Sequence, residues 1–181
     1  MHPAFSVIFF TTLSGAGYGL MAWVGALLIW QGLGPAHGLT MPLSAVAVAL
    51  LVGSALVGIG LFSSTLHLGK PLRAWRAFSQ WRTSWLSREG VMAVVTYLPV
   101  VGLGVWLSTL GTHHDFDALV LTLLAAALAI CALITVVCTA MIYASLPPIP
   151  AWRHRLVVPV YLAFAMLGGA ALLAALPGAH S

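Results

Sequence analysis

The sequence predicts an all-α integral membrane protein, a bundle of five transmembrane helices with an interfacial helix in the second connector. Of its 181 residues, 61% are hydrophobic and only 6% are charged, and the mean hydropathy is +1.06. A soluble domain has about 25% charged residues. Five apolar segments are long enough to cross a bilayer, which takes about 20 residues each. The connectors are short, so residues 1–181 are expected to form a single transmembrane domain.

The predicted spans follow the apolar runs of the chain. They cover residues 5–30, 42–66, 90–110, 118–146 and 156–176. Within the first span, Gly15 and Gly19 form a pair of small residues four positions apart, which allows another helix to approach closely. Glycine recurs in the second span at Gly53, Gly58 and Gly60. We therefore expect both spans to pack closely against other helices, and a contact with a cofactor is the less favoured alternative.

The last three spans have recognisable ends. Ser84 or Ser87 is the expected N-cap of the third span, which would place Glu89 in its first turn, where the helix dipole favours a carboxylate. The fourth span is a long apolar run that ends at the proline-rich stretch 147–150. The fifth span, residues 156–176, then follows directly after a second basic connector.

Charge is distributed unevenly between the two sides of the predicted bundle. With five spans, the connectors 64–90 and 147–155 share one side with the N-terminus, and together they hold all seven Lys and Arg residues. By the positive-inside rule this side is cytoplasmic, in a bacterial inner membrane. If the arginines dock a partner, the asymmetry reports function as well as topology. Basic residues that lie next to spans favour lipid headgroups or a partner subunit over nucleic acid.

The connector 64–90 concentrates the polar residues of this apolar chain. It holds five of the seven Lys and Arg residues, one of the three acidic residues and three of the seven Trp residues. A helix over 72–86 would carry Arg73 and Arg76 on one face. Its opposite face would be aromatic, formed by Trp75, Phe78, Trp81 and Trp85. That pattern is typical of a helix lying in the membrane interface, although Trp residues that simply anchor the chain at headgroup level explain it equally well.

His67 and Glu89 are the two groups at the ends of this connector that could exchange protons. A quinol that loses two electrons must also lose two protons, and a partly desolvated histidine or carboxylate can accept them. The apolar spans would hold the ring and tail of the quinone. In the alternative interpretation, His67 only caps a helix end, and Glu89 only forms a cap and an ion pair with Arg88 or Arg82.

Other chemistries find little support in the sequence. His67 and His154 share a membrane side, but neither lies in the middle of a span, so no haem is expected. Cys131 and Cys138 are too few to hold an iron-sulfur cluster, and no metal site is predicted. No hydrolase, phosphate-binding or zinc-protease motif occurs. A transporter would be expected to show internal repeats and interrupted helices, and neither is evident.

Three stretches resemble one known family. These are His2-Pro3-Ala4 leading into FFTTLSGAGYG (9–19), STLHLGKPLRAWRAFSQWRTSWLSREG (64–90) and CTAMIYASLPPIPAWRH (138–154). They are similar to the membrane anchor subunit of dimethyl sulfoxide reductase and its relatives. The resemblance implies an all-helical bundle without haem. It also implies a molybdopterin catalytic subunit and a ferredoxin-like subunit with four iron-sulfur clusters as partners, with electrons exchanged between the quinone pool and the nearest cluster.

The same resemblance assigns roles to residues. The quinol-site histidine and glutamate of the family fall on His67 in STLHLG and Glu89 in SREG. The basic and aromatic residues between them would line the face toward the iron-sulfur subunit or the quinone ring: Arg73, Trp75, Arg76 and Arg82. Members of the family usually have eight spans, whereas this sequence has five. A contribution to the site from further spans therefore stays open.

The resemblance leaves the direction of electron flow and the type of quinone open. Reductases of the family take electrons from menaquinol, whereas relatives such as sulfite dehydrogenase deliver electrons to quinone, so menaquinone and ubiquinone are both candidate substrates. In either case the chain would be a non-catalytic subunit whose own redox chemistry is confined to the quinone. The alternatives are a purely structural anchor without a quinone site and a small transporter.

Overall fold

The computed structural model describes residues 3–33, 41–65, 75, 78–109, 116–146, 149 and 152–176. These ranges contain five α-helices and no β-strand. The helices are α1 (Pro3–Leu33), α2 (Leu43–Thr65), α3 (Trp85–Thr109), α4 (Phe116–Ala144) and α5 (Val157–Ala175). All five are long and apolar enough to cross a membrane, which confirms the predicted all-helical, five-span architecture.

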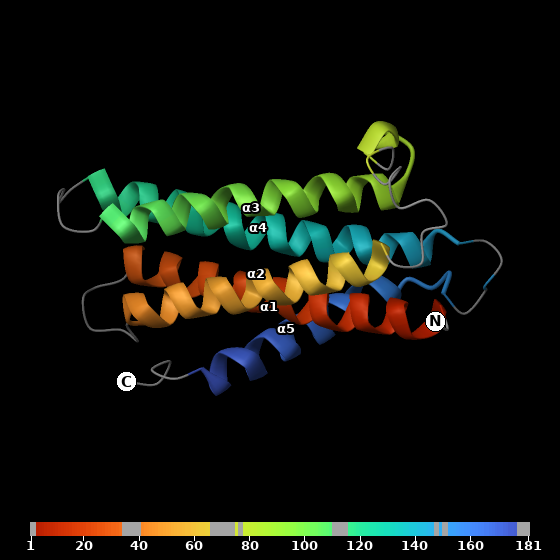
Figure 1. Cartoon of the computed structure of the whole chain (residues 1–181), viewed down its shortest axis with the longest axis horizontal. Coiled ribbons are helices and arrows are strands. Elements are labelled where there is room, and N and C mark those ends of the chain that lie inside the picture. Colours follow the sequence, from red (N-terminus) through yellow and green to blue (C-terminus); the bar gives the residue numbers. More distant parts are fainter. Residues whose placement is uncertain are drawn as a thin grey trace.

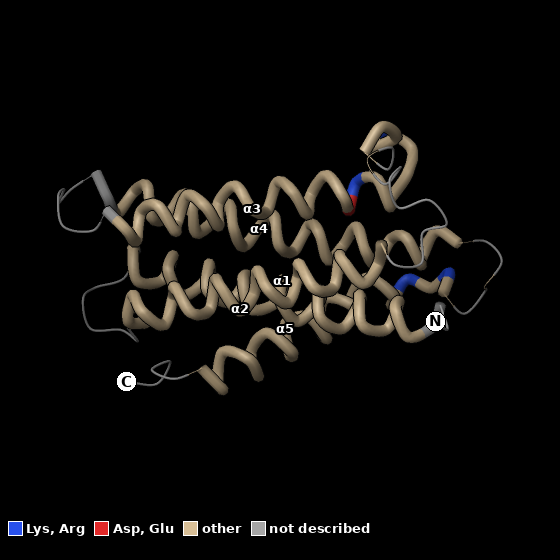
Figure 2. The backbone as a smooth tube through the Cα atoms, in the orientation of Figure 1, with Lys and Arg blue, Asp and Glu red and all other residues tan. Residues whose placement is uncertain are grey.

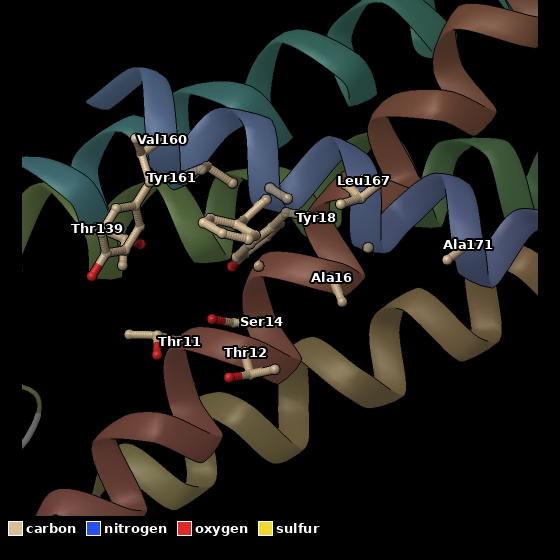
Figure 3. Close-up of a pocket in the computed structure, with 15 residues that line it drawn as sticks. Thr11, Thr12, Ser14, Ala16, Tyr18, Thr139, Val160, Tyr161, Leu167 and Ala171 are labelled. Carbon is tan, nitrogen blue, oxygen red and sulfur yellow. The ribbon is translucent and has the colours of Figure 1, made fainter. Parts of the chain in front are cut away.

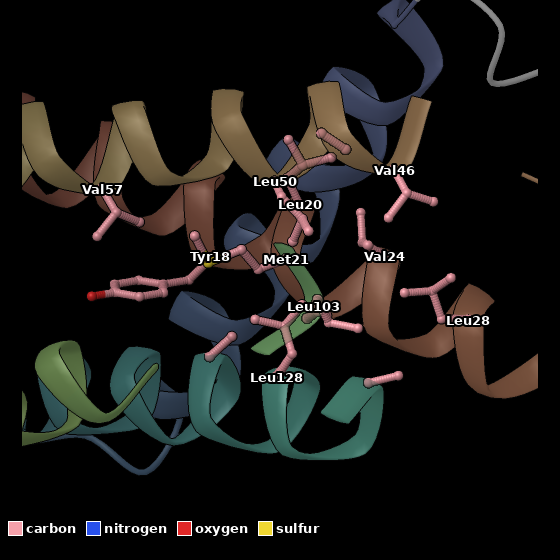
Figure 4. Close-up of a cluster of buried hydrophobic side chains, with 14 of the residues drawn as sticks. Tyr18, Leu20, Met21, Val24, Leu28, Val46, Leu50, Val57, Leu103 and Leu128 are labelled. Carbon is pink, nitrogen blue, oxygen red and sulfur yellow. The ribbon is translucent and has the colours of Figure 1, made fainter. Parts of the chain in front are cut away.

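Helix α1 is the centre of the bundle (Figure 1). It packs against α2, α4 and α5, whereas α3 packs mainly against α4. The buried core lies along α1 and receives side chains from the other helices (Figure 4). Its largest members include Leu20, Met21 and Leu28 of α1, Leu103 of α3 and Leu128 of α4. The fold is thus a pair of helical hairpins, α1–α2 and α3–α4, joined through α1 and α4, with α5 packed against α1.

Glycine residues set the closest helix contacts. A methyl group added at Gly19 of α1 would overlap the backbone carbonyl of Ala165 in α5, and one added at Gly169 would overlap the backbone of Gly19. Trp23 reinforces this contact, because its indole Nε1 donates a hydrogen bond to the Met166 carbonyl at 2.9 Å. Gly15, the other member of the predicted pair, has no atom within 4 Å of a methyl group placed on it. Only Gly19 of this pair is therefore a packing residue.

Helix α3 begins at Trp85, five residues before the predicted start at 90. Ser84 is the cap, since its Oγ accepts a hydrogen bond from the Ser87 N–H at 3.4 Å. The polar first turn is stable because Arg88 folds back over it. Its Nε and Nη2 donate to the carbonyls of Trp81 and Arg82, at 3.0 and 2.7 Å, and its guanidinium lies 4.2 Å from the centre of the Trp85 ring.

This earlier start changes the position of Glu89. It is the fifth residue of α3, and the first turn contains no acidic residue. The expectation that Glu89 lies in the first turn is therefore wrong.

A single helix over 72–86 is not formed. Residues 78–80 make a short 3₁₀ turn, and residues 81–83 form a further turn. The N–H groups of Thr83 and Ser84 donate to the Gln80 carbonyl at 3.1 and 3.0 Å, so the chain changes direction before α3. Trp81 consequently belongs to the turn and Trp85 to α3. Residues 72–74, 76 and 77 lie outside the described residues.

The Lys, Arg, Asp and Glu residues that Figure 2 colours lie at one end of the bundle, the end at which α1 begins. The arginines among them are Arg82, Arg88, Arg153 and Arg155. This grouping agrees with the predicted division of charge between the two sides. The assignment of that side to the cytoplasm stays a prediction.

Candidate functional site

Glu89 is the one charged side chain that is buried among those whose burial the structure describes, with an exposed fraction of 4%. The Thr139 hydroxyl of α4 donates a hydrogen bond to its Oε1 atom. The described residues supply no Lys, Arg or His that forms an ion pair with this carboxyl, and Arg88 points back to the carbonyls before α3. A buried carboxylate without such a partner is costly because it has lost its hydration. The interpretation of Glu89 as a cap with an ion pair is therefore not supported.

Further hydroxyl groups continue the polar contact between α3 and α4. Thr96 Oγ1 and Thr135 Oγ1 lie 3.2 Å apart, and both residues are almost completely buried. Each hydroxyl also donates to a backbone carbonyl of its own helix. Thr96 donates to Met92 at 2.7 Å, and Thr135 donates to Cys131 at 2.8 Å. Interhelical hydrogen bonds of this kind contribute on average about 0.6 kcal/mol in a membrane. The pair therefore adds modestly to the cohesion of α3 and α4.

A cavity of about 530 Å³ lies between α1, α4 and α5 (Figure 3). Its polar lining consists of Thr11, Thr12, Ser14, Tyr18, Thr139 and Tyr161, and its apolar walls include Phe164 and Leu167. Figure 3 shows Thr139 and Tyr161 across the cavity from the threonine and serine side chains of α1. Because Thr139 lines the cavity and bonds Glu89, the buried carboxyl lies one hydrogen bond away from it.

Tyr18 is the most unusual residue of this cavity. Its exposed fraction is 2%, and its hydroxyl has no hydrogen-bond partner among the described residues. A buried polar group left without a partner costs about 1–3 kcal/mol. A ligand in the cavity could remove this cost, since the Tyr18 hydroxyl can donate a hydrogen bond to it.

A second cavity, of about 410 Å³, extends this space toward the charged end of the bundle. It shares Thr11, Val160 and Tyr161 with the first cavity and is also lined by Tyr143, Trp152 and His154. The ring centres of Tyr143 and Trp152 are 5.2 Å apart, and those of Tyr143 and Tyr161 are 5.6 Å apart. Aromatic rings thus line the second cavity, up to the Tyr161 that it shares with the first.

Comparison with known proteins decides the family. A family model described as "DMSO reductase anchor subunit (DmsC)" matches residues 1–180. This chain belongs to the DMSO reductase anchor subunit family. The resemblance stated from the sequence motifs is thereby confirmed.

A curated relative and the solved structures complete the comparison. A sulfite dehydrogenase subunit of Allochromatium vinosum is 42% identical to this anchor-family chain over 188 residues, which cover 97% of the chain and 55% of the relative. The chain thus spans about half the length of this relative. No solved structure matches the chain.

The structure locates only part of the site that the anchor-family motifs suggested. Glu89 is buried as described, whereas Trp75 is 65% exposed and Arg82 is also exposed. Arg82 lies with its guanidinium 5.6 Å from the Trp81 ring centre. His67, Arg73 and Arg76 lie outside the described residues. Their placement relative to Glu89 stays a prediction.

Three residues of the cavity in this anchor-family chain were missed from the sequence. Ser14 and Tyr18 lie in a stretch rich in glycine and hydroxyl residues, for which we favoured packing over contact with a cofactor. Thr139 lies in a long apolar run without any charged neighbour. A signal did exist, because hydroxyl groups within an apolar span must find partners or face a polar cavity.

Proposed function

We propose that this chain is the membrane anchor and quinone- or quinol-interacting electron-transfer subunit of a molybdopterin and iron-sulfur oxidoreductase complex. Membership of the anchor family supports this proposal. The observation that carries it is the burial of Glu89 near the charged end of α3, without an ion pair among the described residues. Ionisable groups within membrane segments are rare, and they usually mark proton or ion pathways.

Glu89 and His67 would handle protons in this function. Oxidation of a quinol releases two electrons and two protons. The electrons pass to an iron-sulfur cluster of the partner subunit, and the two side chains accept the protons. Reduction of a quinone uses the same groups in reverse. Around them, Arg73, Trp75 and Arg82 would line the face toward the ring or the iron-sulfur subunit, together with Arg76.

The partners would be a ferredoxin-like subunit with four iron-sulfur clusters and a molybdopterin catalytic subunit. They would dock on the basic connector 64–90, which we place on the cytoplasmic side with the N-terminus. Menaquinone or ubiquinone would bind as the substrate. The relative named as a sulfite dehydrogenase subunit favours electron flow toward quinone.

A purely structural anchor is the second candidate function. The hydrogen bond from Thr139 to Glu89 joins α4 to α3, so the carboxyl would also serve to hold these helices together. In that case another subunit or further spans would bind the quinone, and substitution of Glu89 would lower stability but leave quinone turnover intact.

Purification in mild detergent tests whether the chain anchors such a complex. We expect the chain to copurify with molybdenum and iron, measured by elemental analysis. A chain that is stable in detergent and retains neither metal would contradict the proposal. The double variant Arg73→Gln with Arg76→Gln should lose both metals, because it removes cations from the proposed docking connector. As a matched control, Arg153→Gln with Arg155→Gln removes the same charge from the other basic connector and should retain them.

A further inference from the structure

The cavity between α1, α4 and α5 has the features of a ligand site. Its volume of about 530 Å³ falls within the range of about 300–1,000 Å³ that is typical of small-molecule pockets. Tyr18 lines it, and the buried hydroxyl of this residue has no partner among the described residues. The hydroxyls of Ser14 and Thr139 line it as well, each already bonded within the protein, to the Phe10 carbonyl at 2.6 Å and to Glu89. Of these three hydroxyls, only that of Tyr18 is therefore unsatisfied.

This combination indicates the class of ligand. Aromatic and aliphatic walls, formed by Phe164, Val136 and Leu167 among others, suit a flat apolar ring. A single buried donor suits a ligand that carries an oxygen acceptor on that ring. A lipid acyl chain would leave the Tyr18 hydroxyl without a partner. A highly polar solute would find the hydroxyls of Thr11, Ser14 and Thr139 already bonded within the protein.

We propose that this cavity holds the ring of a quinone, with the Tyr18 hydroxyl donating a hydrogen bond to one ring oxygen. The inference rests on the proposed function and adds to it a location and a binding residue. Thr139 lines the same cavity, so a ring bound here lies next to the hydroxyl that bonds Glu89. The carboxyl that the proposed function uses would then be one side chain away from the ring.

The openings of the cavity fit the tail of such a ligand. Phe164 and Leu167 line it and are 69% and 67% exposed, so this side of the cavity reaches the outer surface of α5, which would face the lipid. The isoprenoid tail leaves along this surface. The second cavity, which shares Tyr161 with the first, leads instead to Trp152 and His154 at the charged end.

Filling the cavity is the first test. Gly15 lines it and has no atom within 4 Å of an added methyl group, so the side chain of Gly15→Leu would project into the space proposed for the ligand. Equilibrium dialysis of the purified complex against tritium-labelled short-chain naphthoquinone and ubiquinone should show binding to wild type and at least tenfold weaker binding to Gly15→Leu. Gly104→Leu is the matched control, because Gly104 also faces open space but lies on α3 outside the cavity. It should bind as wild type does.

Removing the hydroxyl is the second test. Tyr18→Phe keeps the ring and should weaken quinone binding by about three- to tenfold, as expected for one lost hydrogen bond. Tyr97→Phe removes a hydroxyl that bonds the Ser54 carbonyl at 3.0 Å outside the cavity, and it should leave the Kd unchanged.

If wild type binds quinone and both Gly15→Leu and Tyr18→Phe bind equally well, the cavity assignment is overturned while the proposed function stands. If wild type binds neither quinone, the proposed function fails as well.

Discussion

Replacing Glu89 with Gln is expected to lower quinone-linked turnover of the complex by about 10²-fold or more, the usual contribution of a positioned acid or base. Glutamine retains a side-chain oxygen that can accept the hydrogen bond from Thr139, so the contact between α3 and α4 is preserved. It cannot accept and release a proton. The loss of turnover should therefore occur without a matching loss of stability.

The measurement compares two electron routes in the same preparation. Turnover with a quinol or quinone should fall in Glu89→Gln, whereas turnover with a soluble redox dye, which reaches the catalytic subunit directly, should stay at the wild-type rate. Thr96→Val is the control, because it weakens the same helix interface by removing the Thr96 to Thr135 contact. It should lower thermal stability slightly and leave quinone turnover intact. Equal quinone turnover in Glu89→Gln and wild type would favour the structural anchor.

Replacing Gly19 with Leu is expected to displace α5 from α1. A methyl group at this position already overlaps the Ala165 carbonyl, and backbone atoms cannot move aside as the end of a flexible side chain can. Overpacking of this kind costs about 1–3 kcal/mol, which corresponds to a decrease in Tm of roughly 2–12 °C for a chain of this size.

Thermal unfolding in detergent measures this effect. Gly104→Leu introduces the same side chain where no atom lies within 4 Å, and it should unfold at the wild-type temperature. The indole of Trp23 provides a local probe, since its hydrogen bond to the Met166 carbonyl should be lost only in Gly19→Leu and its fluorescence should shift accordingly. Identical melting of both variants would show that α5 does not depend on this contact.

The helices could be predicted from the sequence because length and hydropathy alone determine which segments can span a bilayer. The start of α3, in contrast, could not be predicted from the sequence. Arg88 makes residues 85–89 look too polar for a span, yet its side chain satisfies the carbonyls of Trp81 and Arg82 and stacks on Trp85. The aromatic spacing over 72–86 was misleading for a related reason, because bonds to the Gln80 carbonyl turn the chain between Trp81 and Trp85.

Of the residues predicted to handle protons, only Glu89 is located by the structure. It stood out because a carboxyl next to an apolar run is rare. Tyr18 could not be predicted in this way, since a tyrosine in a span is ordinary. Its significance arises from the packing of α1, α4 and α5, which leaves its hydroxyl buried and without a partner among the described residues. The role of His67 stays a prediction.

The pairing of neighbouring helices has a consequence for how the chain enters the membrane. Helix α3 packs mainly on α4, the helix synthesised directly after it. Glu89 therefore finds Thr139 within its own hairpin and does not depend on α1 or α5 for this bond. Insertion of the two helices as one unit would shield the carboxyl from hydrocarbon during biogenesis, before the rest of the bundle assembles around it.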